Sequence, residues 1–150
     1  MSDNKIINIS GISEGRVAPV GAYIAEKYGR PVLMVTSSGI KAKRLGEDLS
    51  FFAHKKVYVM PDVGEIFLRY EAKTHHELLE RLKILKALAT GEDCIVVAPI
   101  GAVLKKMVSP SQFLKNVMGL QLGDQLNLEE MKERLVTMGY ERVPMVATKG

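Results

Sequence analysis

The 150-residue sequence predicts an α/β fold in which helices flank a parallel sheet. Short apolar runs recur along the first ~115 residues, and segments whose apolar residues have helical spacing separate them. The runs are continuous rather than alternating, as in strands that are buried on both faces of a parallel sheet. Glycine or proline stands at several boundaries between the two kinds of segment. Strands that alternate with helices at this spacing imply βαβ units with right-handed crossovers.

The chain is expected to begin with two strand–helix pairs. The first pair is a short strand over residues 5–9 and a helix over residues 19–28, with Pro19 in the first turn, where its missing amide costs nothing. A second strand is expected over residues 32–36, where the apolar run is continuous. The helix that follows, residues 40–53, has apolar residues at helical spacing on one face and charged residues on the other.

Two further strands are expected over residues 57–60 and 94–98. The later one contains Cys94, the single cysteine, which is most simply a small buried core residue. Between these strands, leucines at helical spacing predict the strongest helix of the chain over residues 78–89. Residues 61–74 show little periodicity and are expected to form a long connection.

A short helix over residues 99–106 is expected to complete the first domain, which we place at residues 1–117. The pattern then changes. A half-exposed strand is expected over residues 119–124, where apolar and other residues alternate, and residues 140–143 are expected to lead into another strand.

The helix between these last two strands has clear end signals. Asn127 is a good N-cap, Glu130 completes a capping-box-like pair, and Gly139 closes the helix. One strand–helix–strand unit cannot bury its own apolar face. We therefore expect residues 118–150 to begin a second, smaller α/β module whose remainder lies beyond Gly150.

Residues 11–18 lie between the first expected strand and helix, where a phosphate-binding P-loop would lie. A P-loop needs glycine-rich backbone around the phosphates, a lysine for the β- and γ-phosphates, and a serine or threonine hydroxyl for Mg²⁺. No Gly-Lys-Ser/Thr triplet occurs in the chain. We interpret the segment as a degenerate P-loop that binds no cofactor, and an ordinary βα loop is the alternative. Its positions are Gly11, Gly15, Arg16, Val17 and Ala18.

The composition fits a soluble globular protein, with 47% hydrophobic and 25% charged residues. The net charge of +4 permits weak attraction to nucleic acid but does not argue for it. A single cysteine excludes an internal disulfide. No segment approaches the ~18 apolar residues of a membrane span, and the first residues have no signal-peptide pattern. A cytoplasmic protein without membrane contact is expected.

One polar cluster could bind a metal, because His76 and Glu80 are four residues apart and His75 and Glu77 lie beside them. The His-Glu-x-x-His spacing of zinc hydrolases is absent, however. A solvated helix N-terminus, which acidic residues stabilise, is therefore favoured. No metal ligand is predicted.

Two other clusters are also better explained by a solvated surface. Asp62, Glu65 and Glu71 could pair for acid–base chemistry, but no positioned histidine supports them, so no catalytic residue is predicted. A DNA-binding surface would combine basic residues with aromatic stacking partners, which are few in this chain. The basic candidates are Lys41, Lys43, Arg44, Lys55, Lys56, Lys105 and Lys106.

Short motifs along the chain occur together, in the same order, in a known family. They are Arg30-Pro31, Glu47-Asp48 with Phe52, Pro61-Asp62, Glu80-Arg81-Leu82, Ile95 to Ala102, Gly123-Asp124, and Glu133 to Arg142. Each is weak alone, and their collinear order at matching distances carries the assignment. On these motifs the chain, from about Gly11 to Gly150, resembles the N-terminal region of the bacterial transcription-repair coupling factor, Mfd, and the matching region of the nucleotide-excision repair protein UvrB.

The resemblance implies that nucleotide chemistry has been lost. In UvrB the first turn carries Gly-x-x-Gly-x-Gly-Lys-Thr. Aligned without gaps, this chain has Val17 at the lysine and Ala18 at the threonine, and a shift of one residue places Arg16 and Val17 there. Neither register restores a hydroxyl after a lysine. This matches the coupling factor, whose N-terminal module is UvrB-like without ATPase function.

The resemblance also implies partners. Residues 118–150 match the start of the domain with which both proteins bind UvrA. The expected function is a non-catalytic interaction module that helps to recruit UvrA to stalled RNA polymerase in nucleotide excision repair and packs against other domains of the parent protein. ATP, Mg²⁺, RNA polymerase and DNA would be engaged through regions outside this chain. The alternatives are an ATP-binding P-loop fragment of a UvrB- or helicase-type protein, and a nucleic-acid-binding domain.

Overall fold

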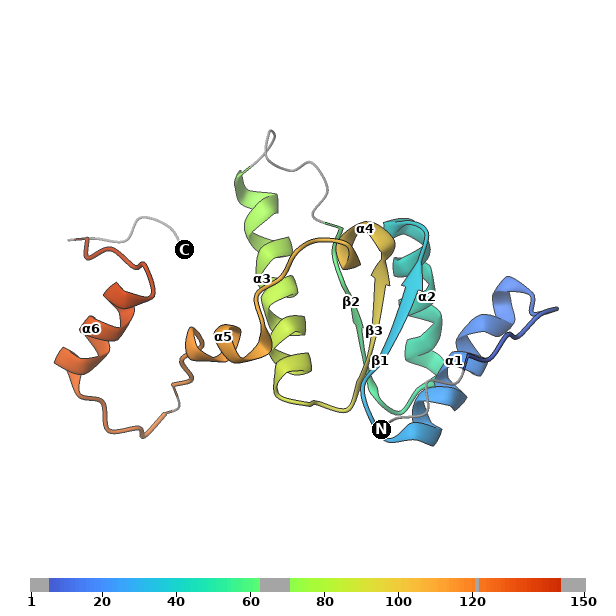
Figure 1. Cartoon of the computed structure of the whole chain (residues 1–150), viewed down its shortest axis with the longest axis horizontal. Coiled ribbons are helices and arrows are strands. Elements are labelled where there is room, and N and C mark those ends of the chain that lie inside the picture. Colours follow the sequence, from blue (N-terminus) through green and yellow to red (C-terminus); the bar gives the residue numbers. More distant parts are fainter. Residues whose placement is uncertain (1–5, 63–70, 121, 144–150) are drawn as a thin grey trace. The chain divides into compact units, whose positions relative to one another are not determined.

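A computed structural model describes residues 6–62, 71–120 and 122–143. The chain divides into two compact units, one that ends at Lys106 and one that starts at Met107. Each unit is described by itself. The first unit contains the sheet and its flanking helices (Figure 1).

The sheet has three parallel strands: β1 (Val32–Thr36), β2 (Lys56–Val59) and β3 (Cys94–Pro99). Their order is β1-β3-β2, so β3 lies in the centre, with Val96 paired to Leu33 on one side and to Tyr58 on the other. All six residues of β3 are buried. The continuous apolar run of the sequence therefore marks the strand that is covered on both faces, and the predicted α/β class with a parallel sheet is confirmed.

Helices cover the two faces of the sheet. Helices α1 (Glu14–Tyr28) and α2 (Gly39–Phe52) lie on one face, and α3 (Glu71–Ala89) lies on the other (Figure 1). Each face has its own apolar cluster. The cluster under α1 and α2 includes Leu49 and Ile95, and the cluster under α3 includes Ile84 and Val96.

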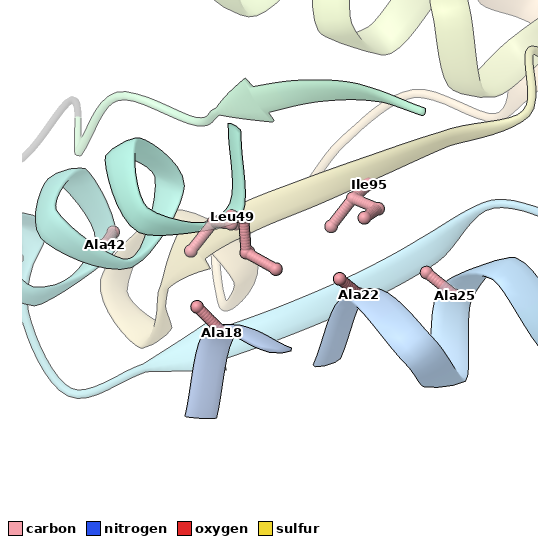
Figure 2. Close-up of a cluster of buried hydrophobic side chains, with 7 residues drawn as sticks. Ala18, Ala22, Ala25, Ala42, Leu49 and Ile95 are labelled. Atoms are coloured by element: carbon pink, nitrogen blue, oxygen red, sulfur yellow. The ribbon is translucent and has the colours of Figure 1, made fainter. Parts of the chain in front are cut away.

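The contact between α1, α2 and the sheet is built from small side chains (Figure 2). A methyl group added at Gly21 would lie 2.7 Å from Cε of Met34 in β1, and one added at Gly46 would overlap Val59 of β2. Small residues let helix backbones approach a neighbouring surface closely, and the branched side chain of Val59 leaves no space for a methyl group at Gly46. The buried small residues are Ala18, Ala22 and Ala25 of α1 and Ala42 of α2.

The amino ends of the strands are joined by polar contacts. Nζ of Lys55 lies 2.8 Å from the carbonyl oxygen of Ala25 and 2.6 Å from Oδ1 of Asp93, and only 9% of the Lys55 side chain is exposed. The backbone amide of His54 donates to Oε1 of Glu26 at 3.1 Å. These bonds connect the end of α1 to the loops that precede β2 and β3.

The predicted first strand is wrong within the described residues. Residues 6–10 form no strand, and Ile6 is 88% exposed; residue 5 lies outside the description. A strand needs a neighbour for its backbone groups, and a local apolar run does not supply one. The helix predicted over residues 19–28 begins earlier, at Glu14, so Pro19 lies inside it.

The other strands and helices predicted in the first unit are found close to their predicted residues. The predicted strands at residues 57–60 and 94–98 correspond to β2 and β3. Helix α3 extends the helix predicted over residues 78–89, because the last four residues of the expected connection, 71–74, are helical. Residues 63–70 lie outside the description. The predicted helix after Pro99 is shorter than expected, since α4 spans Ile100–Val103.

The second unit contains two short helices, α5 (Pro110–Lys115), which the sequence analysis missed, and α6 (Leu128–Thr137). The predicted cap of α6 is confirmed: Oδ1 of Asn127 accepts from the amides of Glu129 at 3.1 Å and Glu130 at 3.4 Å. At the other end the backbone turns at Gly139, whose φ is 93°. Neither helix contains a buried residue.

The strand predicted over residues 119–124 is not formed in the described residues, and the strand that residues 140–143 are expected to lead into lies outside the description. Residues 119–124 include a turn at 122–123, and Gly123 has φ of 99°, which interrupts an extended chain. Residues 140–143 are irregular, and residues 121 and 144–150 lie outside the description. The placement of a UvrA-interaction module from residue 118 stays a prediction.

The tight helix–sheet contact predicts the effect of a single methyl group. We expect Gly46→Ala to lower the free energy of unfolding by about 1–3 kcal/mol, because Val59 must move to admit the new methyl group. Urea denaturation measures the change. Gly15→Ala is the matched control, since nothing lies within 4 Å of a methyl group there, and it should leave stability unchanged or slightly raised. Equal effects of the two substitutions would contradict the packing argument.

Candidate functional site

The segment predicted to be a degenerate P-loop is mostly helical. Gly11 has φ of 75°, and the chain enters α1 directly after Ser13, whose carbonyl oxygen accepts from the amide of Arg16 at 2.9 Å. The other predicted positions, residues 15–18, therefore lie in the first turns of α1. The non-helical turn is shorter than the sequence analysis expected, because the helix starts five residues before Pro19.

A cavity of about 390 Å³ lies beside this turn. It is bounded by the end of the N-terminal segment, by one face of α1 and by β1. None of its lining side chains carries a charge, a hydroxyl or an amide. The lining residues are Ile9, Gly11, Ile12, Val17, Val20, Gly21, Ile24 and Met34.

The two P-loop registers place different residues in this environment. In the ungapped register, Val17 lines the cavity and Ala18 is only 1% exposed, within the α1–α2 cluster. In the shifted register, Arg16, which is exposed at the start of α1, takes the lysine position and Val17 takes the threonine position. Neither register places a hydroxyl where Mg²⁺ would need it, and the buried position of Ala18 leaves no room for a longer side chain.

The electrostatics of the turn also disfavour a phosphate. The amino end of a helix carries a partial positive charge that attracts anions, and α1 has an acidic residue, Glu14, in its first turn. This carboxylate stabilises the helix end and repels a second anion. The lining side chains of the cavity are suited to contact apolar groups, since none of them offers a polar partner.

The polar residues around His76 and Glu80, which the sequence favours as a solvated helix end, lie in the first half of α3. Glu80 lies 2.6 Å from Nζ of Lys83, and this hydrogen bond holds the pKa of the Glu80 carboxyl below its usual value. No group of three or more potential ligands is close enough to hold a metal within the part of the chain that the structure describes. The side chain of His75 lies outside that part.

Several of the basic and acidic residues that the sequence analysis explained as solvated surface make contacts within the fold. Lys55 and Lys56 form ion pairs with Asp93 and Glu92, so two of the candidate DNA-binding cations are already used within the fold. The carboxylate of Asp62 lies over Gly101 at the start of α4, whereas Glu65 and the side chain of Glu71 lie outside the description.

Cys94 is buried in β3, as its apolar surroundings in the sequence predict. Burial raises the pKa of the Cys94 thiol, and the nearby carboxylates of Glu92 and Asp93 raise it further. A thiol with a raised pKa is a poor nucleophile, so the role of this residue is packing. Across the residues that the structure describes, no helix is both long and apolar enough to cross a membrane.

The burial of Ala18 predicts that a long charged side chain cannot be accommodated at this position. We expect Ala18→Lys to lower the free energy of unfolding by about 3 kcal/mol or more, since an ammonium group would enter an apolar cluster without a partner. Gly15→Lys introduces the same side chain one turn earlier, at an exposed site, and serves as the control. Thermal unfolding followed by circular dichroism compares the two variants. Similar melting temperatures would show that position 18 is not a core position.

Comparison with known proteins gives a consistent group of relatives. No family model matches the chain. It is 28% identical over 144 residues to the transcription-repair-coupling factor of Bacillus subtilis. The aligned residues make up 95% of this chain and 12% of the relative. Identity to the coupling factor of Staphylococcus haemolyticus is 28% over 149 residues, covering 96% of this chain and 12% of the relative. The chain thus spans about one eighth of the length of these relatives. Its motifs indicate a resemblance to transcription-repair-coupling factors, and this resemblance is confirmed over nearly all of its residues.

Proposed function

We propose that this chain is a non-catalytic protein-interaction module of a transcription-repair coupling factor. The similarity to coupling factors, which extends over 85–96% of the chain, supports the link to transcription-coupled repair. The proposal that the module is non-catalytic has a separate basis in the degenerate turn. A P-loop binds a triphosphate with ammonium, hydroxyl and backbone amide groups, and the cavity at this turn is lined by aliphatic side chains and glycine.

The apolar lining is the observation that carries the proposal. A bound nucleotide would place three phosphates next to side chains that cannot replace their hydration, and burying charge without a partner is costly. The α/β scaffold remains well packed nevertheless, since β3 is buried along its whole length. The fold therefore has a packed core, but no polar side chains line the cavity where a nucleotide would lie. This combination supports a role in contacts with other proteins.

We propose UvrA as the partner, with recruitment to stalled RNA polymerase in nucleotide excision repair as the outcome. The second unit supports a docking role, because α6 has no buried residue and exposes apolar side chains. Leu128 and Val136 are eight residues apart on this helix, so they lie on one face, and Val136 is 63% exposed. In this proposal the module packs against other domains of a longer cytoplasmic protein, which supplies the ATP-driven motor and the contacts with DNA and RNA polymerase.

An ATP-binding P-loop fragment is the second candidate, and one observation favours it. Arg16 is exposed at the amino end of α1, where a guanidinium group could reach a phosphate. This candidate requires the shifted register, in which Val17 follows the cation and no hydroxyl is available for Mg²⁺.

The two candidates differ in their response to nucleotide. We expect about 2 mM Mg-ATP to leave the melting temperature unchanged, because the cavity has no group to bind phosphate. A site filled at a hundred times its Kd would add ~2.7 kcal/mol, which corresponds to a rise of several degrees for a domain of this size. Arg16→Ala is the diagnostic variant. A rise in the wild type that this variant abolishes would establish the ATP-binding candidate instead.

The recruitment proposal predicts capture of UvrA. Purified UvrA should bind the immobilised chain, and Val136→Lys should weaken capture at least tenfold, because a charge within an apolar contact costs about 1.4 kcal/mol or more. Ile40→Lys is the control, since Ile40 is 74% exposed on α2, in the other unit. Failure of the wild-type chain to capture UvrA would exclude direct recruitment by these residues. Equal losses in both variants would show that α6 is not the contact.

A further inference from the structure

We draw no further inference here: the strongest candidate, the side-chain cluster at the carboxyl ends of β2 and β3 in which the 9% exposed Arg81 lies 3.6 Å from Sδ of Met60 and 3.4 Å from the carbonyl oxygen of Ala102, carries nothing, because residues 63–70 lie outside the description and nothing in the structure shows which group pairs with its guanidinium.

Discussion

The close approach of α1 and α2 to the sheet is the constraint on which the rest of this structure depends. Alanine and glycine at the contact positions allow the helices to lie close against the sheet, and at Gly46 the side chain of Val59 leaves no space for an added methyl group. Met34 fills the space beside Gly21, and Val59 fills the space beside Gly46. Close packing of this kind tolerates few substitutions, because each added methyl group forces its neighbours to move.

The same constraint shapes the turn that the sequence analysis interprets as a degenerate P-loop. Since Ala18 belongs to the packed contact, the helix begins its buried face where a P-loop would hold its threonine. The preceding residue, Val17, faces an aliphatic cavity rather than a phosphate. Position 18 therefore serves the core and is not free to serve a nucleotide. At the opposite end of the strands, the contacts of Lys55 hold the end of α1 against the loops before β2 and β3, which stabilises the same helix position.

Local signals in the sequence predicted the parts of the fold that local physics determines. The continuous apolar run of β3, the Asn127 cap and the glycine after α3 are recognisable because burial on both faces, capping and left-handed backbone each require particular residue types. The predicted strand at residues 5–9 failed because a strand also needs a neighbour, which an apolar run does not reveal. Helix α5 was missed because six residues carry little periodicity.

The candidate site also combines features that local residues determine with features that depend on the whole fold. That the turn has no lysine followed by a serine or threonine can be read from the sequence, whereas the cavity cannot. Its walls come from residues as far apart as Ile9 and Met34, and only the fold brings them together. Val17 lines this cavity and Ala18 enters the core because α1 begins at Glu14. The sequence did not reveal this start, because Pro19 was expected in the first turn of the helix.

The central claim is that the start of α1 is a packing surface rather than a phosphate site. Amide chemical shifts of the ¹⁵N-labelled chain, followed while Mg-ATP is added to millimolar concentration, test this claim most directly. The account predicts that the amides from Gly11 to Ala18 keep their chemical shifts throughout. Saturable changes confined to those amides would show that triphosphate binds at the turn and would contradict the account.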